Sequence, residues 1–210
     1  MKSALIVDDH PVVRAAVKLV LEAERFKVIH EASSASEAMA LSREHKPKLV
    51  VLDLKLPGVG GLEVLERLKA TDPDCRVLIF TSQDPLHYQD RCLRGGAMGY
   101  VAKTNQLLQL HKAVQALMSG YSYFAALTGD GLVSTPSHRS EKQLIDELSN
   151  RELNILVQLA LGKPNKKIAA EMFLSHKTVS TYKTRLIKKL GLHSKSAVYL
   201  REFAKRNHLM

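Results

Sequence analysis

The sequence predicts an α/β domain with a doubly wound parallel sheet, followed by a smaller domain made only of helices. Strand-like and helix-like segments alternate five times up to about residue 120, and from Glu141 onward the apolar spacing is helical. Between them the periodicity is lost and glycine, serine and proline become frequent, which is typical of a linker. We therefore expect domains over residues 1–120 and 143–210, joined by a linker over 121–142.

Five short apolar runs are the expected strands of the first domain. The run from Leu49 to Leu52 shows no polar alternation, as in a strand that is buried on both faces of a sheet. The run at Val28 looks closer to a sheet edge because polar residues interrupt it. The expected strands are residues 4–7, 28–32, 49–52, 76–80 and 99–102.

A helix is expected after each strand, and most begin or end at a recognisable signal. Proline fits the first turn of a helix, serine caps a helix, and paired glycines end one. The expected helices begin at Pro11, run from Ser34 or Ser36 to Glu44, and span 61–71, 85–94 and 106–118. The side chains expected to face inward are Val12, Val13, Ala16, Leu19 and Val20 on the first helix, Leu62, Leu65 and Leu68 on the third, and Leu107, Leu110, Val114 and Leu117 on the fifth.

The C-terminal domain is expected to contain four helices. Ser149 and Glu152 have the spacing of a capping box at the start of the first helix. The others are expected over residues 165–172, from a Ser175 cap to Leu190, and over 194–206. A short helix, a tight connection and a longer helix match a helix-turn-helix unit. The last helix carries Ala197, Val198, Leu200 and Phe203, which are expected either at a dimer face or in the core of their own domain.

The third of these helices has a polar face without acidic residues. Lys177, Ser180, Thr181, Thr184, Arg185 and Lys188 recur at i, i+3, i+4, i+7, i+8 and i+11. Residues 149–210 hold 13 Lys/Arg against 3 Asp/Glu, whereas residues 1–120 hold 16 against 14. A solvated helix face normally mixes both signs. This face therefore indicates binding to the phosphates and base edges of double-stranded DNA rather than an ordinary solvated surface.

In the first domain, four strands end directly in reactive side chains. Asp8 and Asp9, Asp53, Thr81 and Lys103 follow the first, third, fourth and fifth strands. Ligands of parallel α/β sheets bind outside these strand ends. A carboxylate can accept a phosphoryl group when a divalent cation such as Mg²⁺, held by acids, screens their repulsion. Taken singly, Asp53 could instead cap the strand or start a turn, and Thr81 could be an ordinary cap.

These motifs resemble the NarL/FixJ family of two-component response regulators, which join a flavodoxin-like (βα)5 receiver domain to a LuxR-type helix-turn-helix. The second half of the resemblance lies in Ser149-Asn150-Arg151-Glu152, Asn165-Lys166-Lys167-Ile168-Ala169 and Lys177-Thr178-Val179-Ser180-Thr181-Tyr182. The last motif, together with residues 120–124, is similar to the BvgA/EvgA branch. The resemblance covers nearly the whole chain apart from the linker.

The resemblance implies a role for each strand-end residue. Asp53 would become the aspartyl phosphate, and Asp9, Asp53 and the backbone carbonyl of Lys55 would hold Mg²⁺, with Asp8 acting through water. Thr81 and Lys103 would bind the phosphoryl oxygens, and Tyr100 would be a switch aromatic, although it could simply pack at the strand edge. The implied DNA contacts are Asn165, Lys166, Lys167, Ser175, Lys177, Thr178, Ser180, Thr181, Tyr182, Thr184, Arg185, Lys188 and Lys189.

The implied function is transcription regulation rather than enzymatic turnover. A sensor histidine kinase or phosphotransfer domain would phosphorylate Asp53, which would control dimerisation and sequence-specific DNA binding, with RNA polymerase as a further partner. No apolar run is long enough to cross a bilayer, Met1-Lys2-Ser3 leads directly into a strand, and Cys75 and Cys92 lack metal-like spacing, so a bacterial cytoplasmic protein without a membrane partner is expected.

Three other functions compete with this interpretation. A small phosphatase or phosphotransferase would have no need of a basic helical domain. A constitutive DNA binder with a receiver used only for dimerisation would not need an intact set of Asp8, Asp9, Asp53, Thr81 and Lys103. A nonspecific architectural protein would bind all DNA sequences equally at a fixed salt concentration.

Overall fold

The structure is a computed structural model that describes residues 2–103, 107–124, 141–192 and 197–210. It divides into two compact units, Met1–Leu127 and Thr128–Met210. Most of the expected linker, residues 125–140, lies outside the described residues, as do Ser194, the expected start of the last helix, and Gln106, the expected start of the fifth.

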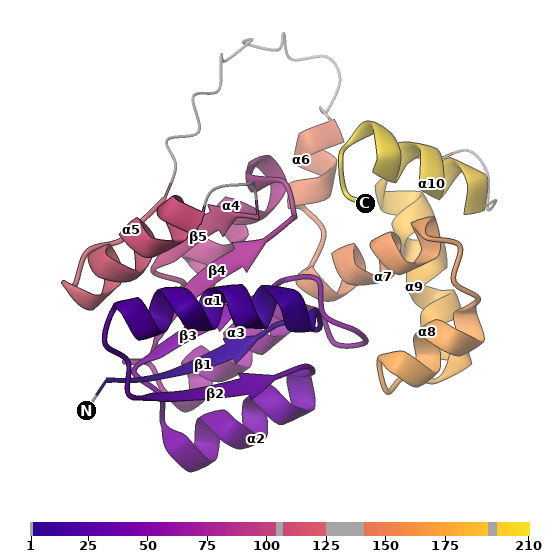
Figure 1. Cartoon of the computed structure of the whole chain (residues 1–210). Helices are drawn as coiled ribbons and strands as arrows, with labels where there is room; N and C mark the ends of the chain where they lie inside the picture. The colour runs from indigo at the N-terminus through magenta and orange to yellow at the C-terminus, as the bar shows by residue number, and fades with distance from the viewer. Residues whose placement is uncertain (1, 104–106, 125–140, 193–196) are drawn as a thin grey trace, which may run out of the picture. The chain divides into compact units, whose positions relative to one another are not determined.

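The first unit is built on a five-stranded parallel sheet with the order β2-β1-β3-β4-β5 (Figure 1). The doubly wound sheet predicted from the sequence is confirmed, with β2 at an edge. The register pairs Val7 with Leu52 and Thr81 with Ala102, so neighbouring strands end side by side. The strands are β1 (Ser3–Val7), β2 (Val28–Ala32), β3 (Leu49–Leu52), β4 (Arg76–Thr81) and β5 (Gly99–Ala102).

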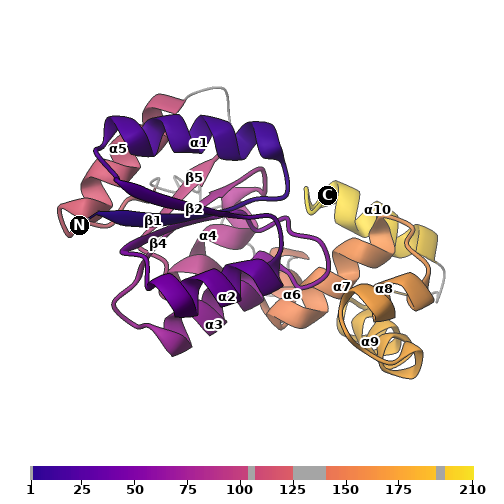
Figure 2. The same cartoon turned by 60° about the horizontal axis from the view of Figure 1, so that its bottom comes forward.

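Helices cover both faces of this sheet. Figure 2 shows α1 and α5 on one face and α2 and α3 on the other, and α4 packs next to α3. Every residue of β3 is buried, as expected for a central strand between two helical layers. The helices are α1 (Pro11–Ala23), α2 (Ala35–His45), α3 (Gly61–Thr71), α4 (Pro85–Arg94) and α5 (Leu107–Met118), and Ser34 rather than Ser36 caps α2.

Two details of the predicted core are wrong. Val12 and Leu19 of α1 are 79% and 67% exposed, because the inward line of this helix runs through Val17 and Leu21. Leu107, at the start of α5, is also exposed, whereas Leu110, Val114 and Leu117 are buried. Apolar residues on the outer side of an amphipathic helix widened the predicted stripe beyond the face that meets the sheet.

The second unit is all-helical, as predicted, but α6 (Glu141–Asp146) precedes the four expected helices. Leu156, Val179, Leu186 and Phe203 are buried in its core, where α10 packs on α7 and α8 packs on α9 (Figure 1). Leu200 and Phe203 therefore serve the core of their own unit and are wrong as dimer-face residues. The other helices are α7 (Asn150–Ala160), α8 (Asn165–Glu171), α9 (His176–Lys189) and α10 (Ala197–Arg206).

The capping box predicted at the start of α7 is confirmed. The Ser149 hydroxyl accepts a hydrogen bond from the Glu152 backbone N–H at 3.2 Å, and the Glu152 carboxylate accepts one from the Ser149 N–H at 2.9 Å. Each side chain thus satisfies an N–H group that the helix leaves unpaired. None of the described helices has both the length and the hydropathy needed to cross a membrane.

Candidate phosphoacceptor site and nucleic-acid interface

Two acids lie at adjacent strand ends in the middle of the sheet. Asp53 follows β3, and its backbone N–H donates to the carbonyl of Val7 at 2.9 Å. Asp8 follows β1, and its N–H donates to the carbonyl of Ala32 at 3.0 Å. The connection after β1 leads to β2 on one side, and the connection after β3 leads to β4 on the other. Such a switch point is where parallel α/β sheets bind ligands.

Lys103 bridges these two acids. Its ammonium lies 2.6 Å from a carboxylate oxygen of Asp8 and 2.6 Å from one of Asp53, although both acids are only 2% exposed. Buried carboxylates need such a partner because burial removes their hydration. The backbone N–H of Lys103 donates to the carbonyl of Thr81 at 2.7 Å, which fixes the end of β5 against that of β4.

Asp9 and His10 complete an acidic cluster beside Asp8. The Nδ1 atom of His10 lies 2.6 Å from an Asp9 oxygen, and the His10 backbone N–H donates to the Asp8 carboxylate at 3.0 Å. Asp8, Asp9 and His10 each offer a ligand atom, and these atoms lie within 4.8 Å of one another. The cluster is therefore chemically able to hold a cation.

The loop after Asp53 is held close to the site. The backbone N–H of Lys55 donates to the Asp53 carboxylate at 3.1 Å, while the Lys55 side chain is exposed. Gly61 packs against the loop so tightly that an added Cβ would lie 2.4 Å from the Asp53 carbonyl oxygen. Only glycine fits this approach without moving the segment that carries Asp53.

Thr81 and Tyr100 are both tied to the loop that follows β4. The fully buried Thr81 hydroxyl accepts from the Gln83 N–H at 3.3 Å, and the Tyr100 hydroxyl donates to the Gln83 carbonyl at 2.7 Å. Burial raises the pKa of Tyr100 well above its ordinary value, so the phenol stays protonated and keeps donating. Gln83 links the predicted hydroxyl ligand to the predicted switch aromatic.

Arg14 is a site residue that the sequence analysis missed. Its guanidinium donates to the backbone carbonyl of Asp8 at 2.9 Å and to the Glu31 carboxylate at 3.2 Å. The Lys18 ammonium lies 3.2 Å from the same Glu31 carboxylate but does not contact Asp8. A basic residue one turn into the helix that follows the acids was the only available signal, and such residues are common on helix surfaces.

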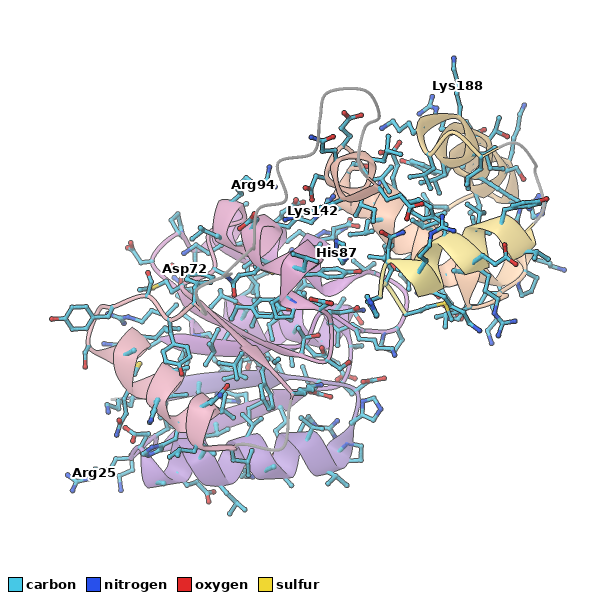
Figure 3. The ribbon with its side chains drawn as sticks, turned by 90° about the horizontal axis from the view of Figure 1, so that it is seen from above. Arg25, Asp72, His87, Arg94, Lys142 and Lys188 are labelled. Atoms are coloured by element: carbon cyan, nitrogen blue, oxygen red, sulfur yellow. The ribbon has the colours of Figure 1, made fainter. Side chains whose placement is uncertain are left out.

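In the second unit, the predicted DNA-binding face of α9 is open to solvent. Lys177, Thr181, Arg185 and Lys188 are exposed, and Figure 3 shows Lys188 pointing outward. Ser175 caps this helix by accepting from the Thr178 N–H at 3.0 Å. Lys166 and Lys167, at the start of α8, are also exposed. Basic side chains are thus available along α9 and at the start of α8.

Two family models match the chain. The response regulator receiver domain matches residues 4–115, and the luxR family of bacterial regulatory proteins matches residues 146–201. The chain belongs to the LuxR-family response regulators. It is a two-component response regulator that binds DNA to regulate transcription, and it is not an enzyme.

Relatives of this response regulator align over almost its full length. The virulence-factor transcription regulator BvgA of Bordetella pertussis is 46% identical over 205 residues, which is 98% of this chain and 97% of BvgA. The DNA-binding transcriptional activator EvgA of Escherichia coli K12 is 34% identical over 99% of both chains. RcsB of Salmonella enterica serovar Typhimurium, solved on promoter DNA, shares the fold with a TM-score of 0.67, 20% identity and 98% coverage of both chains.

Some predicted DNA contacts of the response regulator bond to other protein groups. Lys189 lies 2.8 Å from the buried Glu152 carboxylate. Burial alone would raise the pKa of Glu152, but hydrogen bonds from Lys189 and Ser149 lower it below its usual value. The Asn165 side chain donates to the Ser180 hydroxyl at 3.2 Å, and Tyr182 is half-buried. The Lys189 contact joins α9 to α7 and the Asn165 contact joins α8 to α9, so these two side chains serve packing within the second unit.

Proposed function

We propose that phosphorylation of Asp53 switches this response regulator between two states of DNA binding. The observation that supports this most directly is the Lys103 ammonium, which lies 2.6 Å from both the Asp53 and the Asp8 carboxylates. A cation placed against a buried nucleophilic carboxylate can transfer its contact to the oxygens of a phosphoryl group that becomes attached to that carboxylate. A histidine kinase or a phosphotransfer domain would be the donor.

In the proposed step, an Asp53 oxygen attacks the phosphorus atom of the donor. A new O–P bond forms while the bond from phosphorus to the donor breaks, and the donor group leaves with its electron pair. Lys103 then pairs with the phosphoryl oxygens, and the Thr81 hydroxyl, released from the Gln83 N–H, donates to them. Tyr100 stays buried behind Thr81 and shifts the Gln83 loop with it.

The acidic residues present are suitable for Mg²⁺. Asp8 and Asp9 offer carboxylate oxygens within one cluster, and Asp53 and the Lys55 carbonyl lie at the neighbouring strand end. Magnesium prefers such hard oxygen ligands together with water. Asp9, Asp53 and the Lys55 carbonyl would hold the ion, and Asp8 would act through water. The bound ion would neutralise charge between the Asp53 carboxylate and the incoming phosphoryl group.

The proposed output is dimerisation and tighter binding to specific double-stranded DNA. Two copies of α9 would enter successive major grooves about 34 Å apart, as in other helix-turn-helix dimers. Lys177, Ser180, Thr181, Thr184 and Arg185 would face the groove, and Lys166, Lys167 and Lys188 would meet phosphates. RNA polymerase would be the further partner at a promoter, and the bacterial cytoplasm would be the compartment.

The phosphorylation is tested by the intact mass of the full-length protein after incubation with acetyl phosphate and Mg²⁺. We expect the wild type to gain one phosphoryl group and Asp53→Ala to gain none. A gain of equal size in Asp53→Ala would place the phosphoryl group elsewhere and refute Asp53 as the acceptor. No gain in either protein, even with a purified phosphorylated phosphotransfer domain, would refute the switch.

A further inference from the structure

Several helices of this chain end in the same hydrogen-bonded turn, which requires a left-handed residue. At the end of α7 that residue is Gly162, with φ of +78°, and at the end of α9 it is Gly191, with φ of +64°. In both, the N–H of the next residue donates to a carbonyl five positions earlier, from Lys163 to Gln158 at 3.2 Å and from Leu192 to Ile187 at 3.0 Å. Glycine is favoured there because it has no Cβ.

At the end of α8 the same position is occupied by Phe173. Its φ is +56°, its N–H bonds to the Ala170 carbonyl at 3.4 Å, and the N–H of Leu174 bonds to the Ala169 carbonyl at 2.8 Å. A bulky residue in this conformation is strained and is an outlier. The strain is not offset by burial, because Phe173 is 86% exposed, the largest exposed fraction among the large apolar side chains of the described residues.

The surroundings of Phe173 indicate what covers the ring. The residue lies in the turn between α8 and α9, two positions before Ser175, which caps the start of α9. Residues 172–190 contain no Asp or Glu, and the nearest acid in sequence, Glu171, is paired with Lys163 at 2.7 Å. His176 and Lys177 are exposed close by. An apolar ring set among cationic and neutral groups suits a polyanion that also presents apolar edges.

DNA has this chemistry, because thymine methyl groups and deoxyribose carbons lie beside its phosphates. We propose that the Phe173 ring is a DNA contact, which packs on a thymine methyl or a sugar next to the site where the start of α9 enters the groove. The strained turn keeps the ring pointed outward at that place. This inference rests on the DNA binding described above. It adds an apolar contact to the DNA-binding face of α9, whose other exposed side chains are polar or basic.

The test compares Phe173→Gly with wild type on one DNA duplex, which the phosphorylated wild-type protein selects from a random library. Phe173→Gly relieves the strained turn, so we expect the thermal midpoint of the second unit to rise by about 4 °C. We expect its affinity for the duplex to fall about tenfold, the size of one lost apolar contact. A more stable protein that binds DNA less well is not expected from a residue with a purely structural role.

His208→Gly is the matched control. His208 has φ of +51° in the same kind of turn, at the end of α10, with the Leu209 N–H bonded to the Ala204 carbonyl at 2.9 Å. It should gain similar stability without any change in DNA affinity. Phe173→Asn, which also tolerates the left-handed region, should weaken DNA binding as Phe173→Gly does.

Deoxyuridine scanning then separates the two apolar targets in DNA. If wild type loses affinity at one thymine-to-uracil position and Phe173→Gly does not, the ring packs on that methyl group. If no position matters to wild type and Phe173→Gly remains tenfold weaker, the ring packs on a sugar. Both results support the proposal.

Equal affinity of Phe173→Gly and wild type for the duplex would overturn it. If that variant also failed to activate transcription in vitro, the ring would belong to a protein contact, and the DNA assignment would still be wrong. A lower thermal midpoint would contradict the strain argument. A wild-type protein that selects no duplex would refute the DNA-binding proposal itself, which is a different failure.

Discussion

The two functional regions of this response regulator arrange their charges in opposite ways. In the first unit, Lys103 lies between two acids that are each 2% exposed, so the charges are buried and paired with one another. On α9, Lys177, Arg185 and Lys188 are exposed on a helix without acids. Attachment of one small group to a carboxylate can rearrange the buried ion pairs, whereas the exposed face of α9 can bind an extended polyanion. Added salt should therefore weaken DNA binding far more than it weakens the proposed phosphorylation of Asp53.

The largest effect is expected when Asp53, the proposed phosphoryl acceptor, is replaced. Asp53→Asn keeps the shape of the side chain but cannot form the aspartyl phosphate, so labelling from acetyl phosphate should be lost completely. The Lys103 ammonium would still pair with Asp8. Circular dichroism should show an intact fold, and residual labelling of more than a few per cent would contradict the assignment.

Two lysines of α9 should separate DNA binding from stability. Lys188 is exposed and should act on phosphates, so Lys188→Ala should weaken DNA binding to all sequences and lower the salt slope of log K by about one. Lys189 pairs with the buried Glu152, so Lys189→Ala should destabilise the second unit by about 1–3 kcal/mol in thermal or urea unfolding. The reverse assignment of the two effects would refute the distinction.

The pH dependence of the Lys189→Ala effect gives a second check. The pKa of Glu152 is lower in the folded protein than in the unfolded chain. The stabilising contribution of the Glu152–Lys189 ion pair is therefore complete above the pKa of Glu152 in the unfolded chain, about 4.3. It is lost as the pH falls through the pKa of Glu152 in the folded protein. In urea unfolding, the difference between wild type and Lys189→Ala should shrink at acidic pH. A difference independent of pH would show that the ion pair is not its source.

A smaller effect is expected from the support of the acidic cluster. Arg14→Gln removes the hydrogen bond to the Asp8 carbonyl, so the Mg²⁺ concentration needed for half-maximal phosphorylation should rise about threefold to tenfold. Lys18→Gln is the control, because Lys18 shares Glu31 with Arg14 but does not contact Asp8. Equal Mg²⁺ requirements in the two variants would show that the Arg14 contact does not position the cluster.

The smallest effect is expected at Lys55. Its backbone N–H bonds to Asp53 and its exposed ammonium can move near the phosphoryl group, so we expect Lys55→Ala to alter the lifetime of the aspartyl phosphate severalfold at most. The decay of radiolabelled protein at fixed Mg²⁺ measures this lifetime. An unchanged rate of dephosphorylation would rule out a role for the Lys55 ammonium.

Much of the fold was predictable because apolar runs and helix signals are local. β3, α3 and β5 match the predicted residue ranges, and Ser149 and Glu152 form the predicted cap. The sequence could also predict that Asp8, Asp53 and Lys103 meet, since parallel strands end at one edge of a sheet. What it could not show was pairing across distant segments. The Arg14 bond to Asp8 and the Lys189 bond to Glu152 depend on side-chain directions that only the packed structure provides.

Phosphorylation of the proposed acceptor, Asp53, is expected to change DNA binding by the exposed face of α9. The most direct test is the affinity of the full-length protein for its selected duplex, measured by fluorescence anisotropy at fixed salt with and without acetyl phosphate. We predict that phosphorylation tightens binding about tenfold or more in the wild type and leaves Asp53→Ala unchanged. Equal affinities of the phosphorylated and unphosphorylated wild type would contradict the account, even if Asp53 is the residue that carries the phosphoryl group.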